Sequence, residues 1–276
     1  MCGRYAASSS PDDLVEEFEI LDPGAVSRAR DLVLEPDFNV APTKTAPVVL
    51  ERAPRDDRDA APARQLRALV WGLVPSWAKD RSIGSRMINA RAESLLDKPA
   101  YAKAGVARRC LVPADGWYEW QPSPSTTDAK GKPRKQPFFV TGADGGGVAF
   151  AGLYEFWRDD ARDAEDPLAW LVTYAIVTTA AEPDLERIHD RMPLALPRDR
   201  WDAWLSPSVT DTDEVRALLL PPAPGGFRAV PVSTRVNDVR NSSPDLVAPL
   251  AVDEIVGAVD PVTGELIGAA DDTLFT

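Results

Sequence analysis

Short apolar segments separated by turns recur along this chain, and they restrict its possible folds more than any other feature. Gln65–Val74 alternates polar with large apolar residues and Trp170–Thr178 is mostly apolar, so each is predicted to be a β-strand. Further strands are predicted at Thr45–Leu50, Arg108–Pro113, Gly116–Gln121, Phe138–Val140, Val148–Tyr154 and Phe227–Ser233. Many short strands joined by turns favour a twisted, mostly antiparallel, barrel-like sheet.

Helical signals lie between these strands. Ser10 and Pro11 supply an N-cap and a first helical residue, and acids follow, so a helix is predicted from there to about Ile20. Shorter helices are predicted at residues 92–96, 99–104, 182–188, 198–205 and 213–219. Residues 38–43 are expected to form a loop, and the glycine-rich segment 142–147 is expected to close a hairpin. The fold class is therefore α+β, with peripheral helices around the sheet.

No linker separates two hydrophobic cores, which predicts a single domain over residues 1–250. Polar insertions interrupt this domain near residues 52–63, 122–135 and 157–167. These insertions have little apolar surface to bury, so the first two are expected to be flexible. Residues 251–276 are predicted to form a peripheral C-terminal tail.

The charge distribution limits the possible partners. A formal net charge of −12 argues against a nonspecific nucleic-acid binder, which would normally be basic. The acids are clustered at residues 51–59, 159–166 and 211–214, however, and arginines and lysines lie between these clusters. A local basic groove on an acidic protein is therefore compatible with the composition.

The rare residue types exclude several kinds of site. Cys2 and Cys110 are the only cysteines, which gives no disulfide framework and fits a reducing cytoplasm. Zinc ligation by these cysteines and His189, the only histidine, ranks low because no CxxC or HxxxH spacing is present. No metal and no cofactor are predicted, and no GxSxG, GxGxxG or Walker pattern is found. No stretch approaches the roughly 20 apolar residues of a membrane span.

Cys2 directly follows the initiator methionine. If Met1 is removed, Cys2 carries an α-amine beside its thiol, and both groups are nucleophiles near neutral pH. Such a 1,2-aminothiol condenses with an aldehyde to an imine, and the thiol then closes a thiazolidine ring. A buried stub without chemistry is the alternative interpretation, and position alone favours that alternative.

Two further segments carry polar or aromatic side chains in unusual settings. Alternation places Asn89 and Arg91 on one side of their segment, where an amide and a cation could hold a phosphate; a helix cap and a surface arginine are the structural alternative. Trp71 and Trp77 bracket a proline turn, and each could belong to the core or form an exposed surface that stacks on bases.

Two candidate acid–base residues stand apart from the rest. Glu119 lies among three aromatic residues on a predicted strand, where burial would raise its pKa and suit proton transfer; a structural ion pair is the competing account. His189 lies between a short helix and a proline turn, and it could exchange a proton near neutral pH. A thiol peptidase that pairs Cys2 with His189 is a further possibility.

Six motifs occur in order and together resemble the SOS-response-associated peptidase (SRAP) family of abasic-site shielding proteins. They are Met1-Cys2-Gly3-Arg4-Tyr5, Phe38-Asn39-Val40-Ala41-Pro42-Thr43, Trp71-Gly72-Leu73-Val74-Pro75-Ser76-Trp77, Asn89-Ala90-Arg91-Ala92-Glu93, the segment from Arg109 to Trp120, and His189-Asp190-Arg191-Met192-Pro193. The resemblance extends from Cys2 to about Leu250 and departs from the family at the three insertions and the tail.

The resemblance implies a covalent cross-link to abasic sites, preferentially in single-stranded DNA. It implies that Cys2, exposed by autoproteolytic removal of Met1, forms a thiazolidine with the open-chain sugar aldehyde. It further implies proton transfer by Glu119 and His189, and positioning of the Cys2 backbone and the sugar by Asn89. The DNA-binding residues implied are Arg4, Asn39, Trp77, Arg86 and Arg91, with Trp77 stacking or wedging at a duplex junction. A peptidase- or lyase-type enzyme is expected, monomeric, cytoplasmic and associated with the nucleoid during DNA damage, with a general thiol peptidase that uses Cys2, Glu119 and His189 as the alternative.

Overall fold

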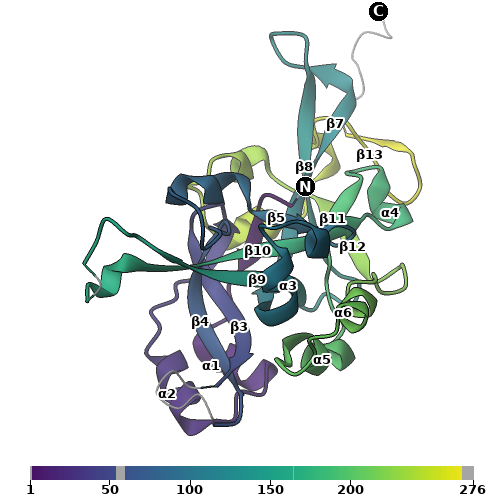
Figure 1. Ribbon diagram of the computed structural model, residues 1–276. Coiled ribbons are helices and arrows are strands. Elements are labelled where there is room, and N and C mark those ends of the chain that lie inside the picture. The colour runs from purple at the N-terminus through teal and green to yellow at the C-terminus, as the bar shows by residue number, and fades with distance from the viewer. Residues whose placement is uncertain (1, 54–59, 164, 269–276) are drawn as a thin grey trace, which may run out of the picture.

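The computed structural model describes residues 2–53, 60–163 and 165–268 (Figure 1). Five strands close into a mixed barrel. β4 (Ala63–Trp71) runs parallel to β10 (Trp170–Ala180), and β10 pairs antiparallel with β9 (Val148–Arg158). Antiparallel pairing through β6 (Arg109–Ala114) and β3 (Thr45–Arg52) completes the ring. The predicted barrel-like, mostly antiparallel sheet is confirmed.

Two short strands lengthen the sheet on β10. β5 (Asn89–Arg91) pairs in parallel with residues 176–178, and β11 (Arg191–Pro193) pairs antiparallel with residues 178–180. Both strands therefore end beside Thr178. The region around Asn89 and the segment that follows His189 thus meet at one edge of the barrel.

A second sheet of five strands packs beside the barrel. Its order is β12 (Phe227–Pro231), β8 (Pro133–Gly142), β7 (Gly116–Thr127), β1 (Tyr5–Ala7) and β2 (Asp37–Val40), and every pair is antiparallel. β7 and β8 extend beyond the sheet as a projecting hairpin, seen at the top of Figure 1. The N-terminal strand β1 is therefore held between β7 and β2 in the interior of this sheet.

Short helices surround the two sheets. The first begins as predicted, because the Ser10 side chain accepts from the backbone N–H of Asp13 and Asp13 bonds back in a capping box. Phe18 at its end stacks on Trp201, with ring centroids 4.6 Å apart. The helices are α1 (Pro11–Glu17), α2 (Pro23–Arg30), α3 (Ala102–Ala107), α4 (Pro183–Glu186), α5 (Trp201–Leu205) and α6 (Thr212–Leu218). The segment 92–96 predicted to be a helix forms instead a short 3-10 turn at Leu95–Asp97.

The core beneath the second sheet is rich in aromatic residues. Trp71, Trp117 and Phe150 are fully buried there, and the ring of Tyr5 packs edge-on against both Trp71 and Phe150. Cys2 belongs to the same cluster. Cys2 and Tyr5 are thus part of the hydrophobic core and have a fixed position.

Three sequence predictions about connections are wrong. Segment 142–147 does not close a hairpin, since β8 pairs with β7 and β12 while β9 pairs with β6 and β10. Turn residues reverse the chain, but they do not determine which strand an apolar segment joins. Residues 37–40 form β2 where a loop was expected, and the supposedly flexible segment 122–135 is mostly strand, the ends of β7 and β8.

The C-terminal segment is more than a peripheral tail. Ile255 and Ala258 are buried in the aromatic core, and β13 (Ala258–Val259) pairs with β14 (Leu266–Ile267). Of the insertion at 52–63, residues 54–59 lie outside the described part of the chain.

Candidate functional site

Cys2 lies at the start of the strand-forming N-terminus, fully buried. Its Sγ points toward the carbonyl of Arg4, 3.8 Å away. Burial raises the pKa of the Cys2 thiol well above its usual value, and the negative charge of Glu119 raises it further. The thiol is therefore protonated at neutral pH, and its environment couples it to Glu119.

Asn89 fixes the backbone of Cys2. Its Nδ2 donates to the carbonyl oxygen of Cys2 at 2.7 Å, and the Asn89 carbonyl accepts from the hydroxyl of Tyr101 at 3.1 Å. The Oδ1 atom of Asn89 is buried, and no described residue bonds to it. The Nδ2 group of Asn89 thus holds the Cys2 backbone, while its Oδ1 atom is a hydrogen-bond acceptor on the same side chain.

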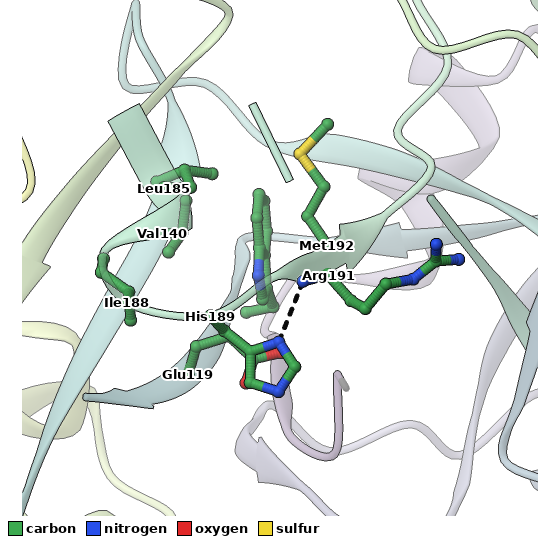
Figure 2. Close-up of a pocket in the computed structure, with 8 residues that line it drawn as sticks. Glu119, Val140, Leu185, Ile188, His189, Arg191 and Met192 are labelled. Carbon is green, nitrogen blue, oxygen red and sulfur yellow. Dashed lines mark hydrogen bonds between the residues drawn. The ribbon is translucent and has the colours of Figure 1, made fainter. Parts of the chain in front are cut away.

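Glu119 lies on β7, two residues after Trp117, so both side chains lie on the same side of the sheet. Burial raises the pKa of Glu119 to about 7. The two residues line one pocket with Val140, Leu185, Ile188, His189, Arg191 and Met192 (Figure 2). A carboxylate in this setting exchanges protons readily at neutral pH.

His189 follows α4 and completes the pocket. Its Nδ1 accepts from the backbone N–H of Arg191 at 3.0 Å, which places the proton of the neutral ring on Nε2. Asp190 Oδ1 also lies 2.9 Å from Nδ1, but this carboxylate is 87% exposed and remains solvated. Burial lowers the pKa of His189, although the charge of Asp190 opposes this effect. The neutral imidazole with an Nε2–H donor is therefore the favoured form.

Arg191 forms a wall of the pocket by pairing with other protein groups. Its guanidinium makes two bonds to the Glu93 carboxylate, at 2.7 and 3.0 Å, and a third to the carbonyl of Thr178 at 2.7 Å. The structure uses Arg191 to join β11 to the segment after β5.

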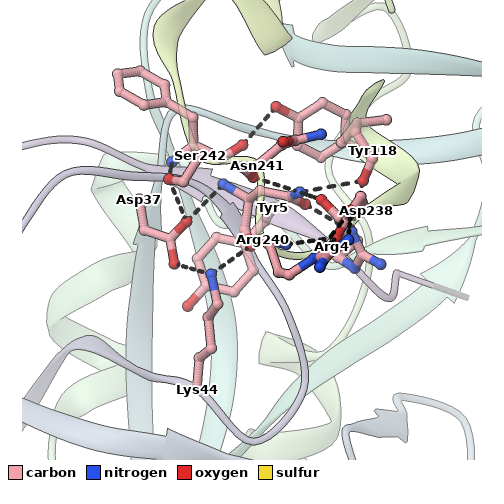
Figure 3. A network of polar contacts seen from close by, with 12 residues as sticks. Arg4, Tyr5, Asp37, Lys44, Tyr118, Asp238, Arg240, Asn241 and Ser242 are labelled. Carbon is pink, nitrogen blue, oxygen red and sulfur yellow. Dashed lines mark hydrogen bonds and ion pairs between the residues drawn. The ribbon is translucent and has the colours of Figure 1, made fainter. Parts of the chain in front are cut away.

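Arg4 lies in a polar network with Asp238 and Asn241 (Figure 3), and Asn39 joins the same network through its hydrogen bonds. Nη1 of Arg4 donates to Asn39 Oδ1 and to the carbonyl of Val236, both at 2.8 Å. The Asn39 amide donates to the carbonyls of Val236, Asp238 and Asn241. Asn39 is fully buried, and these bonds hold Arg4 and the 236–241 segment in place; its expected role in DNA binding stays a prediction.

The remaining expected DNA-binding residues lie at the surface. Arg86 and Arg91 are exposed, and neither guanidinium makes a hydrogen bond or ion pair with the described residues. Trp77 is 62% exposed, whereas Trp71 is fully buried and donates its indole N–H to the carbonyl of Ile88. Trp71 is therefore a core residue, while Trp77 is exposed and its expected stacking on bases stays a prediction.

The structure adds residues that the sequence did not single out. The hydroxyls of Tyr5 and Tyr174 lie 2.5 Å apart in the core, and Trp120 donates its indole N–H to Asn237 at 2.7 Å. Tyr5 and Trp120 belong to the motifs quoted above, but only the paired strands reveal their partners. Among described residues, no histidine, cysteine and carboxylate group forms a possible metal site, and no helix is long and apolar enough to span a membrane.

Residues 1–239 match the family model of SOS response associated peptidase (SRAP). "Abasic site processing protein YoqW" of Bacillus subtilis (strain 168) is 36% identical over 250 residues, which span 90% of this chain and 99% of that protein. "Abasic site processing protein HMCES" of Gallus gallus is 30% identical over 278 residues, which span 91% of this chain and 78% of that protein.

Two solved structures share the architecture. A protein from Bacteroides thetaiotaomicron superposes with a TM-score of 0.71 at 21% identity, over 91% of this chain and all of that chain. A phage-related protein from Bordetella bronchiseptica superposes with a TM-score of 0.58 at 30% identity, over 84% of this chain and 94% of that chain. The first of these likenesses concerns the fold alone.

Proposed function

Because the chain belongs to the SOS response associated peptidase (SRAP) family, we propose that it acts on abasic sites in DNA, capturing them covalently through Cys2. The observation that carries the proposal is the 2.7 Å bond from Asn89 to the Cys2 carbonyl, in a site where Glu119 is electrostatically coupled to the thiol. A fixed N-terminal backbone beside a proton-exchanging carboxylate suits attack on a small carbonyl group. Single-stranded DNA is the proposed substrate, because its sugars are accessible without duplex opening.

The chemistry begins with removal of Met1, which frees the α-amine of Cys2. The amine attacks the C1′ aldehyde of the opened sugar, and the resulting carbinolamine loses water to give an imine. The thiol sulfur then adds to the imine carbon, and its proton passes to the nitrogen, closing a thiazolidine. Removal of Met1 consumes one water molecule, and the condensation of Cys2 with the aldehyde releases one. The raised pKa of the Cys2 thiol supports this order, since a neutral thiol leaves the first attack to the amine.

Glu119 and His189 supply the proton transfers. A carboxyl with a pKa of about 7 accepts a proton from the attacking amine and returns it to the departing hydroxyl. His189 carries its proton on Nε2 and donates it at the sugar oxygen, which also serves reversal of the link. The buried Oδ1 of Asn89 accepts from the freed amine or a sugar hydroxyl.

A general thiol peptidase receives less support. Thiol peptidases use a thiolate whose pKa is lowered by a neighbouring imidazolium. Here burial raises the pKa of Cys2 and lowers that of His189, so both groups are held neutral. Peptidase activity is therefore confined, in this proposal, to removal of Met1.

Intact mass spectrometry after mixing the protein with an abasic single-stranded oligonucleotide tests the proposal. The expected product is the chain without Met1 plus the oligonucleotide minus one water, stable to denaturation. Cys2→Ala should abolish it, whereas Cys110→Ala should retain it, because the Cys110 thiol is buried and its pKa is raised by burial. Adduct formation by Cys2→Ala at the wild-type rate would refute the mechanism. DNA retention that denaturation abolishes would indicate a noncovalent binder.

A further inference from the structure

The β7–β8 hairpin is an exposed arm that carries the densest positive charge outside the candidate site. Residues 128–135 hold four cations and a single acid, Asp128, on a chain whose net charge is −12. All eight residues are exposed, and they run from the free end of the hairpin toward its root, where Lys135 pairs with Pro122. We call this segment the basic arm; its cations are Lys130, Lys132, Arg134 and Lys135.

The charge of the basic arm is unneutralised within the described chain. The Asp128 carboxylate accepts the backbone N–H groups of Lys130 and Lys132 at 2.8 and 2.9 Å. None of the four cationic side chains forms an ion pair or hydrogen bond with another described residue. Elsewhere many exposed arginines are paired, as Arg30 is with Asp12 and Arg198 with Glu19. The arm therefore offers free cations where much of the remaining surface offers compensated ones.

The basic arm is also held rigidly at its root. Gln121 donates to the carbonyls of Arg187 and Val259 and accepts from the Val259 N–H at 2.7 Å. The Thr126 hydroxyl donates to the carbonyl of Val256 at 2.6 Å. Gly257 adopts a φ of +79°, and a Cβ there would lie 2.4 Å from the Ser125 hydroxyl, so glycine permits this close contact. A pre-organised arm loses little conformational entropy when it binds a partner.

The arm continues the strand that carries Glu119. From Glu119 to Thr127 the strand advances by eight residues, or about 26 Å at about 3.3 Å per residue. This reach matches about seven to eight steps of a strand with the ~3.4 Å spacing of double-helical DNA, and fewer steps of an extended single strand. Burial raises the pKa of Glu119, and the positive charge of Lys135 at the root of the arm lowers it by a smaller amount. The electrostatic field of the arm therefore reaches the pocket.

We propose that the basic arm binds the phosphate backbone of the DNA that flanks the captured lesion. The proposal rests on the function proposed above, which brings a polyanion to the pocket at the root of the arm. Lysine and arginine cations bind phosphate oxygens whatever the DNA base sequence. The arm therefore adds affinity and leaves base recognition unchanged. The β9–β10 hairpin also projects, and its Arg162 is paired with Asp159 and Asp166 at an acidic tip. That tip, on a second copy of this chain, is the competing partner for the basic arm.

The test replaces three cations toward the tip, Lys130→Gln, Lys132→Gln and Arg134→Gln, and leaves Lys135 at the root of the arm intact. The matched control removes the same charge on the far side of the molecule, with Arg28→Gln, Arg30→Gln and Arg216→Gln. Both triple variants are made with Cys2 and, for equilibrium binding, with Cys2→Ala. Fluorescence anisotropy follows an abasic oligonucleotide of roughly 30 nucleotides, longer than the arm's reach, and one of roughly seven nucleotides, at several salt concentrations.

The arm variant should bind the long oligonucleotide about tenfold or more weakly, and its salt slope should fall by about 2 to 3, since each lost phosphate contact removes about 0.7 to 0.9. The short oligonucleotide should show no change, nor should its covalent capture by the Cys2-containing arm variant. The control should match wild type throughout. If the triple variant fails to fold, Lys130→Glu alone should weaken long-oligonucleotide binding by about tenfold.

Equal affinity and salt slope in the arm variant, wild type and control would overturn the proposal. So would an unchanged response to DNA combined with a loss of self-association in sedimentation, which would assign the arm to a second copy. Failure of the proposed function has a different signature: wild type would form no covalent adduct with either oligonucleotide.

Discussion

Glu119→Gln should make the protein more stable at alkaline pH while it removes the proton-transfer group. Burial raises the pKa of Glu119 from 4.5 to about 7. Between these two values the folded protein retains a proton that the unfolded chain has released. The free energy of unfolding therefore falls as pH rises through this window and levels off above the folded-state pKa.

The magnitude follows from the gap between the two pKa values. At about 1.4 kcal/mol per unit, the gap corresponds to about 3 kcal/mol in all, of which about 2 to 3 kcal/mol develops between about pH 5 and pH 8. Glutamine keeps the size of the side chain and cannot ionise. The difference in unfolding free energy between Glu119→Gln and wild type should therefore grow by that amount, in favour of the variant, from about pH 5 to pH 8.

Urea unfolding at the two pH values measures this difference, provided that the slope of free energy against urea is shared. Glu16→Gln, which removes an exposed carboxylate of α1, controls for the loss of one negative charge. Adduct formation by Glu119→Gln should slow by about a hundredfold or more, the usual contribution of a general acid–base group. A stability difference that stays constant within about 0.5 kcal/mol across the pH range would refute the raised pKa.

Two further predictions separate binding from folding. Trp77→Ala should change the free energy of unfolding by less than about 0.5 kcal/mol because the side chain is exposed, yet weaken binding to abasic DNA by about 1 to 3 kcal/mol, as measured by urea unfolding and anisotropy. Asn39→Ala should cost about 1 to 3 kcal/mol of stability, because the fully buried Asn39 amide loses its bonds to the carbonyls of Val236, Asp238 and Asn241. The same variant should weaken DNA binding to the level of Arg4→Ala, with no further loss when the two are combined; additive losses would contradict a positioning role.

Local patterns predicted the elements well, but their partners less well. The capping box at Ser10 and the apolar stretch of β10 depend on neighbouring residues, so the sequence displays them directly. The route of the chain through Gly142–Gly147 depends instead on which sheet offers an unpaired edge. That information lies in residues distant along the chain, and the predicted hairpin was wrong for this reason.

The candidate site shows the same division. Glu119 was identified because a carboxylate among aromatic residues is costly to bury, and the structure buries it. Asn39 was expected to bind DNA only because of the family resemblance, and the structure shows that its amide donates to backbone carbonyls about 200 residues away. Backbone acceptors have no sequence signature, so an amide that holds a loop cannot be distinguished from an amide that binds a ligand.

Net charge misleads for a related reason. The sum of −12 counts every ionised side chain equally, although an arginine paired at 2.7 Å with an acid contributes little field at a distance. The local field at a phosphate is set by cations that are not paired with acids. These include Arg86 and Arg91 near the site and the four cations of the basic arm. An acidic protein can therefore bind a polyanion strongly, and the salt dependence of binding will follow the number of unpaired cations at the interface rather than the sign of the whole molecule.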